Sequence, residues 1–234
     1  MKKTIVALTT LAAITASTSA MANTTLNVTA ASNYSYNGVS QTENKPALQS
    51  TITHNFGSDW SIGAFASNVD FANGDGADLE FSPSISKTFK LNDMFSLNAG
   101  AAYYTYHGDK KAKDLNYGEV FSQLNITSSV GSTEVRAAYA WDYFGEDVSH
   151  VVATLAHKVE VTKGHSLRLA FVRSMSANEK KYAWDGKKAY NNYRLSYITS
   201  FKNFEIDLSV EDTNMSIESA KSRVLLSVGR TFNF

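Results

Sequence analysis

Charged side chains recur at every second position of several apolar segments, and this spacing is the main chemical signal in the sequence. In segment 204–210, Glu205 and Asp207 alternate with four apolar residues. A β-strand sorts such residues onto two opposite faces, whereas a helix would scatter them around its surface. Charges in a long strand are costly against lipid but stable beside water. We therefore expect a polar lumen, with these candidate lining residues: Glu134, Arg136, Arg168, Arg194, Glu205, Asp207, Glu211 and Arg223.

The same alternation adds Asp78, Glu80, Glu119, Asp142 and Lys158 to the inward face, which then holds eight acids and five bases. Such a mixture forms no ring of a single charge, so it predicts no sharp ion selectivity.

One pair of opposite charges can be placed from a turn. The two-residue connection Lys202-Asn203 sets a register in which Arg194 lies opposite Glu211. We expect this pair to face inward near the outer mouth. It would be either a structural ion pair that closes a narrow barrel, which we favour, or a constriction that orients a solute.

The sequence shows no catalytic or metal-binding pattern. No cysteine is present, and no histidine sits in an H-E-x-x-H or nucleophile-elbow motif. Ser149 and His150 are adjacent, but neighbouring residues of a strand point to opposite faces. We therefore expect no catalytic residue, no metal and no cofactor. A membrane-embedded hydrolase remains the alternative from the enzyme class.

The charged faces belong to long strands with a period of two residues. No segment has a convincing helical period, so the sequence predicts an all-β protein. The expected strands are near 26–37, 46–56, 60–70, 78–89, 95–106, 116–126, 132–143, 149–161, 166–176, 191–201, 204–210 and 222–234.

The connections between these strands alternate between tight turns and longer loops. The tight turns are at 57–59, 90–94, 127–131, 162–165 and 202–203, and the longer loops at 38–45, 71–77, 107–115, 144–148, 177–190 and 211–221. Short turns on one side and long loops on the other are typical of a transmembrane antiparallel up-and-down β-barrel. Because twelve is an even number, both chain ends fall on the short-turn, periplasmic side.

Aromatic residues gather near the strand ends, as in the interfacial girdles of a membrane barrel. The set near the long loops is Tyr34, Tyr36, Phe71, Tyr103, Tyr104, Tyr106, Tyr139, Trp141 and Tyr143, and the set near the short turns is Trp60, Phe89, Phe95, Phe201, Phe204, Phe232 and Phe234.

The long loops also carry lysines that would form a basic outer rim: Lys110, Lys111, Lys113, Lys180, Lys181, Lys187 and Lys188. Such a rim would collect anions or bind the phosphates of lipopolysaccharide. Solvated loop charge explains the lysines equally well.

Composition and the N-terminus set the context. The 22 basic and 22 acidic residues cancel, which argues against a nucleic-acid partner. After the N-terminus no apolar run approaches the roughly 18 residues of a membrane helix. Lys2 and Lys3, a short apolar core and the pattern Ala20-Met21-Ala22 predict a cleaved signal peptide over 1–22, followed by a barrel over 23–234.

Several segments resemble known families. The C-terminal Phe234, with Phe232 in step behind it, is similar to the assembly signal of bacterial outer-membrane proteins. The segment Ala31-Ser-Asn-Tyr-Ser-Tyr-Asn-Gly-Val-Ser-Gln-Thr42 with Pro46-Ala-Leu-Gln49, then Gly63-Ala-Phe-Ala-Ser-Asn-Val-Asp-Phe71 and Tyr117-Gly-Glu-Val-Phe121, resembles the TorF porin family of proteobacteria, also called Gcw_chp proteins. Many members carry Arg before the glycine, where this chain has Asn37.

The resemblance implies an outer-membrane barrel in a Gram-negative bacterium and, more loosely, passive passage of small hydrophilic solutes. Its partners would be outer-membrane lipids, lipopolysaccharide and, through the C-terminal phenylalanine, the barrel-assembly machinery. The oligomeric state stays open, with a monomer favoured. A non-conducting structural or surface-interaction barrel is the alternative function.

Overall fold

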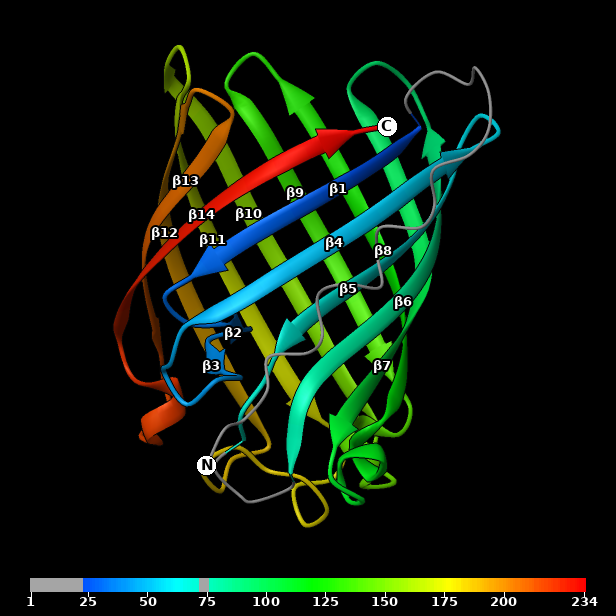
Figure 1. The fold of residues 1–234 in the computed structure, drawn as a ribbon, viewed down its shortest axis with the longest axis vertical. Helices are drawn as coiled ribbons and strands as arrows, with labels where there is room; N and C mark the ends of the chain where they lie inside the picture. The colour runs from blue at the N-terminus through cyan, green and yellow to red at the C-terminus, as the bar shows by residue number, and fades with distance from the viewer. Residues whose placement is uncertain (1–22, 72–75) are drawn as a thin grey trace, which may run out of the picture.

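Alternating apolar and polar residues build a closed antiparallel barrel. The computed structural model describes residues 23–71 and 76–234, so the predicted signal peptide and part of the predicted loop 71–77 lie outside the described residues. Within them, twelve strands form the barrel, and each pairs with its neighbours along the chain (Figure 1). They are β1 (Thr24–Ala31), β4 (Ala47–Phe56), β5 (Trp60–Asn68), β6 (Ala77–Lys90), β7 (Phe95–Gly108), β8 (Tyr117–Ser128), β9 (Gly131–Ala140), β10 (His150–Thr162), β11 (His165–Ser176), β12 (Ala189–Phe201), β13 (Phe204–Thr213) and β14 (Arg223–Asn233).

The sheet closes where β1 pairs with β14, between the two ends of the barrel sequence. Leu26 lies opposite Phe232 and Ala30 opposite Val228 in this pairing. Closure leaves the barrel without an unpaired edge, which is what a strand-built structure needs in an apolar medium. The predicted fold class and the alternation of short turns with long loops are confirmed.

The predicted strand 26–37 is wrong in its second half. β1 ends at Ala31, and the chain then forms a small hairpin of β2 (Ser35–Tyr36) and β3 (Val39–Ser40). Asn37 and Gly38 between them have φ of 50° and 86°. Two consecutive residues in this left-handed region make the tight turn typical of Asn-Gly, which reverses the chain instead of extending the strand.

Most other strand ends differ from the prediction by one or two residues, and two differ by three. The strand predicted over 132–143 ends at Ala140, because the chain then makes a short 3-10 turn, η2 (Tyr143–Gly145). The strand predicted over 204–210 continues to Thr213, where it places two more polar side chains on its inner face.

The barrel wall is apolar outside and mainly polar inside. Leu155, Leu169 and Leu226 point outward and are 52%, 61% and 47% exposed. Their strand neighbours Ala156 and Leu225 point inward and are buried. Burial thus follows the two-residue period, as the sequence pattern requires. No helix in the described part of the chain is long and apolar enough to cross a membrane.

Aromatic residues near the long loops divide between the two faces, so the predicted outer girdle there is partly wrong. Tyr103, Tyr139 and Trp141 are exposed on the outside. Tyr106 and Tyr143 instead belong to a buried cluster inside the mouth, with Tyr34, Phe71 and Tyr104 packed against it. Adjacent strand residues face opposite ways, so a band of sequence-neighbouring tyrosines cannot all face outward. At the short-turn end every predicted girdle residue except Phe95 is among the exposed large apolar residues.

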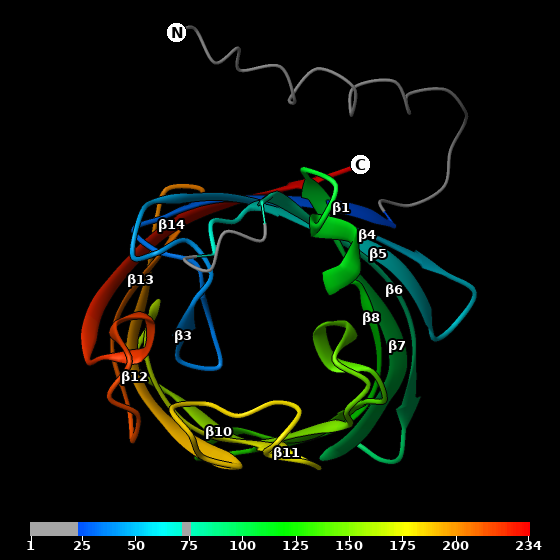
Figure 2. The same ribbon diagram turned by 90° about the horizontal axis from the view of Figure 1, so that it is seen from below.

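Loops fold into the long-loop end of the barrel and build this cluster. Figure 2 shows η1 (Ala112–Leu115), η2 and the β2–β3 hairpin projecting inside the ring of strands, while η3 (Glu218–Ala220) lies near the wall. Tyr117, Tyr143, Trp184 and Tyr190 are each buried there. The barrel is therefore narrowed by its own loops at this end.

Gly100 is a point where two strands approach too closely for a side chain. A Cβ at Gly100 would lie 2.3 Å from the carbonyl oxygen of Ile85 and 2.8 Å from the Phe121 ring. We expect Gly100→Val to destabilise the barrel by about 1–3 kcal/mol, the usual cost of overpacking. Urea unfolding in detergent, followed by heat-modifiable gel mobility, measures it. Ala101→Val on the opposite face is the matched control. Equal stability of both variants would contradict the close approach.

Candidate functional site

The β2–β3 hairpin projects into the lumen, and it is bound to wall strands on both sides of β1 (Figure 2). The Tyr34 hydroxyl donates to Oε2 of Glu80 on β6 at 3.1 Å. The Ser35 hydroxyl donates to Oε1 of Glu211 on β13 at 2.5 Å. The Tyr36 ring packs edge-on against Tyr104 of β7, with ring centroids 6.2 Å apart. Because the hairpin lies inside the ring of strands, it narrows the lumen and forms a constriction there (Figure 2).

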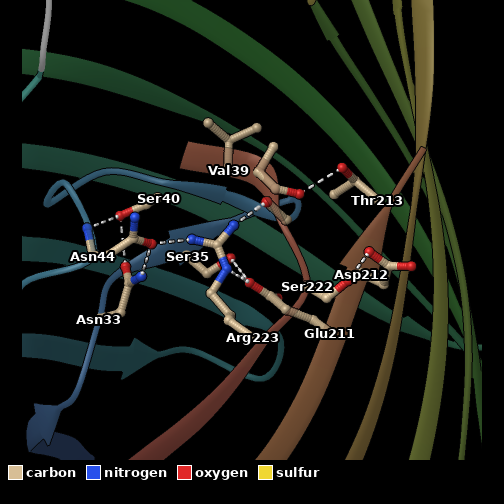
Figure 3. A network of polar contacts seen from close by, with 12 residues as sticks. Asn33, Ser35, Val39, Ser40, Asn44, Glu211, Asp212, Thr213, Ser222 and Arg223 are labelled. Atoms are coloured by element: carbon tan, nitrogen blue, oxygen red, sulfur yellow. Dashed lines mark hydrogen bonds and ion pairs between the residues drawn. The ribbon is translucent and has the colours of Figure 1, made fainter. Parts of the chain in front are cut away.

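Arg223 on β14 is the central tie of this constriction (Figure 3). Its Nη2 donates to the carbonyl oxygens of Gly38 and Ser219, each at 2.7 Å, and its Nη1 donates to Asn44 Oδ1 at 2.6 Å. Its Nε lies 3.1 Å from Oε1 of Glu211, and the two side chains are only 11% and 2% exposed. One guanidinium thus fixes the hairpin, the loop that follows it and the wall strand β13, as a rigid fork of donors allows.

The hairpin turn itself fits tightly against the wall. A Cβ at Gly38 would lie 2.5 Å from Asn192 Nδ2 and 2.6 Å from Thr213 Cγ2. Glycine is needed here both for the positive φ and for this contact. Asn33 supports the hairpin from behind: its Oδ1 accepts from Ser40, and its Nδ2 donates to Asn44.

Further inward charges form ion pairs between strands of the wall, from β8 to β11. Arg136 lies 2.8 Å from Glu119, and Arg168 lies 3.5 Å from Glu134. All four are on the inward faces that the alternation predicts. Opposite charges on one wall neutralise each other, so the lumen presents paired groups instead of a single-sign surface.

Arg194 has the predicted register but not the predicted ion-pair partner. Its backbone lies opposite Glu211, as expected from the Lys202-Asn203 turn. Its guanidinium instead lies 3.5 Å from Asp207 and donates to Ser209 at 2.7 Å. Oε1 of Glu211 is instead contacted by Nε of Arg223 and accepts from the Ser35 hydroxyl.

The other candidate lining residues have less defined contacts. Glu205 is exposed toward the short-turn end, and Lys158 is half-buried; neither forms an ion pair with a residue that the structure describes. Glu80, which the sequence also assigned to this face, is 1% exposed and accepts from Tyr34 and Ser82.

A cavity of about 420 Å³ lies beside the hairpin inside the barrel. The hairpin contributes Tyr34 and Tyr36, while Gln49 of β4, Phe65 of β5 and Arg194 of β12 belong to the surrounding wall. Aromatic rings, neutral polar groups and the charged side chains of Glu80 and Arg194 therefore face one space at the narrow part of the lumen.

The lysines predicted to form an outer rim are exposed, but two of them tie loops together. Lys181 forms an ion pair with Asp147, and this hydrogen-bonded contact lowers the pKa of the Asp147 carboxyl below its usual value. Lys187 donates to the carbonyl oxygen of Asn214 at 2.9 Å. The neighbouring loops also carry Asp142 and Glu146, so the rim mixes charges of both signs. The remaining rim lysines are exposed: Lys110, Lys111, Lys113, Lys180 and Lys188.

The structure separates the one pair of residues that could have suggested nucleophilic catalysis. The Ser149 hydroxyl is 2.9 Å from the Tyr139 hydroxyl, on the outside of the barrel. His150 is 2% exposed and packs against Tyr143 and Trp184, with ring centroids 4.0 and 5.1 Å away. Its ring nitrogens have no hydrogen-bond partner among the described residues. Within residues 23–71 and 76–234, no group of three acidic, histidine or cysteine residues is arranged to hold a metal ion.

The C-terminal residues of the expected assembly signal lie on the outside of the short-turn end. Phe232 and Phe234 are 37% and 61% exposed. The Phe234 backbone N–H donates to the carbonyl oxygen of Thr24, which keeps the end of the chain in the sheet.

Sequence reasoning missed the hairpin, which makes the constriction. The dipeptide Asn37-Gly38 between two short β-prone segments was the available signal. The long alternating run around it masked this signal.

Comparison with known proteins places the chain in a family. The family model described as "Bacterial protein of unknown function (Gcw_chp)" matches residues 15–232. No curated protein sequence matches the chain.

Solved structures with a similar fold are outer-membrane porins and channels. The NanC porin has a TM-score of 0.64 at 8% identity, covering 89% of this chain and 99% of NanC. The KdgM porin has a TM-score of 0.58 at 10% identity, covering 90% of this chain and 99% of KdgM. An outer membrane channel from Pseudomonas putida F1 has a TM-score of 0.54 at 10% identity, covering 92% of this chain and 97% of that channel. At such low identity the likeness concerns the fold.

Removing Arg223 tests the buried tie. Arg223→Met leaves the Glu211 carboxylate buried with the Ser35 hydroxyl as donor, and breaking a buried pair in this way costs about 3–5 kcal/mol. We expect a loss of that size in urea unfolding, and a smaller loss for the double variant Arg223→Met with Glu211→Met. Arg168→Met is the control, because its pair with Glu134 is half-exposed and should contribute ~1 kcal/mol or less. Equal losses in both single variants would refute the central role of Arg223.

Proposed function

Since the chain belongs to the Gcw_chp family of bacterial proteins of unknown function, we propose that it is an outer-membrane channel of a Gram-negative bacterium. It lets small hydrophilic solutes diffuse passively through a lumen that the β2–β3 hairpin narrows. The observation that carries this proposal is the constriction: a closed barrel with an apolar outside, a polar inside and a folded segment held inside the lumen.

The outer surface supports a location in lipid. Large apolar side chains such as Leu155, Leu169 and Leu226 cover the middle of the strands on the outside. A continuous apolar surface of this kind is unstable in water but matches the hydrocarbon core of a bilayer. Aromatic residues lie exposed near both strand ends, among them Trp141 near the long loops and Trp60 at the short turns.

The inner surface supports the passage of water-soluble solutes. Twelve strands enclose a lumen between the packed interior of eight-stranded barrels and the open channel of 16-stranded porins. The ion pairs Arg136–Glu119 and Arg168–Glu134 line part of its wall. A narrow channel with modest ion selectivity fits this lining.

The remaining partners follow from the same location. Phe232 and Phe234 would present the assembly signal to the barrel-assembly machinery. Exposed loop lysines such as Lys110 and Lys180 would contact lipopolysaccharide phosphates. The barrel closes on itself within one chain, which is consistent with a monomer.

One observation favours a second candidate, a non-conducting structural or surface-interaction barrel. Buried Tyr106, Tyr117, Tyr143 and Trp184 fill part of the mouth at the long-loop end. If this cluster and the hairpin together close the lumen, the loops serve contacts with the envelope and not transport.

Conductance separates the two candidates and tests the hairpin as the constriction. The mature chain, refolded in detergent and inserted into planar bilayers, should give small discrete current steps. Replacing residues 34–41 by two glycines should raise the step size several-fold, because it removes the hairpin from the lumen. Two glycines can bridge the gap, since the Gln41 N–H donates to the Tyr34 carbonyl oxygen and the ends of this segment lie together. Heat-modifiable gel mobility controls for folding. A folded but silent protein would favour the structural barrel, and unchanged steps after the replacement would reject the hairpin as the constriction.

A pair of arginine substitutions tests the membrane-facing surface. Leu226→Arg places a charge on the outside near the middle of β14 and should destabilise the barrel in bilayers by about 2–4 kcal/mol. Ser227→Arg, the next residue, points inward opposite Asp207 and should cost much less. Urea unfolding in lipid vesicles measures both. The same small cost for the two variants would argue against lipid contact at Leu226.

A further inference from the structure

The cavity beside the hairpin combines aromatic rings with neutral polar groups. Its volume of about 420 Å³ lies within the range of ~300–1,000 Å³ that is typical of small-molecule sites. Its position at the constriction means that a solute passing through the lumen would contact its walls. Its lining therefore bears on which solutes the barrel accepts.

Aromatic rings flank the cavity in two pairs. Tyr34 and Phe65 have ring centroids 5.5 Å apart, and Tyr36 and Tyr104 have centroids 6.2 Å apart. Tyr104 also stacks on Tyr117 at 4.6 Å, which holds its ring in place. These rings offer fixed apolar faces, which bury the C–H face of a ring-shaped solute at little entropic cost.

Neutral hydrogen-bonding groups line the wall between the rings. Gln49, Ser84 and Ser227 come from β4, β6 and β14 and all line the cavity. Among the described residues none of the three side chains forms a hydrogen bond, and each can both donate and accept. Groups of this kind match the hydroxyl groups of a polyhydroxylated solute.

The charged residues of the cavity already have protein partners. Glu80 is 1% exposed, and its two oxygens accept from Tyr34 and Ser82. Arg194 is bound to Asp207 and Ser209. A charged solute would lose water here without gaining a free counter-charge, so the cavity favours a neutral one.

We propose that this cavity is a binding subsite for a neutral pyranose sugar, with the sugar ring against the aromatic faces and its hydroxyl groups on Gln49, Ser84 and Ser227. The proposal rests on the proposed channel function and specifies its solute class. The hairpin then acts as the selective element of the lumen, since it supplies Tyr34 and Tyr36.

Three sugars with the same ring test the charge preference. Addition of D-glucose should interrupt the ion current through single channels in a concentration-dependent way. D-glucuronate and D-glucosamine, its anionic and cationic counterparts, should bind at least about tenfold more weakly than D-glucose. Stronger interruption by either charged sugar would overturn the neutral site.

Substitutions of the rings test the location. Tyr104→Leu and Phe65→Leu keep apolar volume but lose the flat face, and each should weaken glucose binding about tenfold, which corresponds to ~1.4 kcal/mol. Tyr103→Leu is the matched control, because Tyr103 is the neighbouring residue on β7 and is 49% exposed on the outside. Equal effects of Tyr103→Leu and Tyr104→Leu would reject the cavity as the binding site.

Binding measured without current keeps the two proposals separate. Saturation-transfer NMR of D-glucose with the detergent-solubilised protein reports the subsite even in a barrel that does not conduct. A conducting channel with no glucose signal would overturn the sugar site and leave the channel proposal standing. A silent barrel with a glucose signal that Phe65→Leu removes would support the site and overturn the channel.

Discussion

The pairing of β1 with β14 is the constraint on which the rest of the structure depends. It joins the two ends of the barrel sequence, so each of the twelve barrel strands that the structure describes has two neighbours. Once the sheet is closed, a side chain can point only outward or into the lumen. The two-residue period then places leucines such as Leu169 outside and charges such as Arg168 inside, and the lumen receives a charged lining as a direct consequence of closure.

That lumen is narrowed by a segment which belongs to the connection between β1 and β4. The β2–β3 hairpin pairs only two residues of β2, Ser35 and Tyr36, with two residues of β3, Val39 and Ser40. An isolated hairpin of this size is not stable in water. Its position depends on side chains of the wall, above all Arg223 and Glu211. The constriction is therefore a property of the closed barrel, because these two residues lie far from the hairpin in sequence.

Aromatic packing and charge pairing both shape the lumen near the hairpin, where Tyr34 and Val39 pack against the buried cluster. Toward the long loops, the buried side chains of Tyr117, Tyr143 and Trp184 fill part of the mouth. Around the hairpin, the ions are held in pairs such as Arg194 with Asp207, and neutral groups remain for a solute. The same arrangement explains why charged residues can be numerous in the lumen without giving it one dominant sign.

The sequence by itself determined the strands, their alternating faces, the two kinds of connection and the register of Arg194 with Glu211, because these depend on neighbours two residues apart or on one tight turn. Only the tertiary structure decided that 32–46 folds inward, that Tyr104 and Tyr106 pack inside while Tyr103 faces out, and that Arg194 binds Asp207. An arginine in a closed lumen reaches acids on several strands, and which one it takes depends on the groups that already occupy them. Here Glu211 is held by Arg223, its partner on the next strand, and by Ser35, which is remote in sequence, and no local pattern encodes the contact with Ser35.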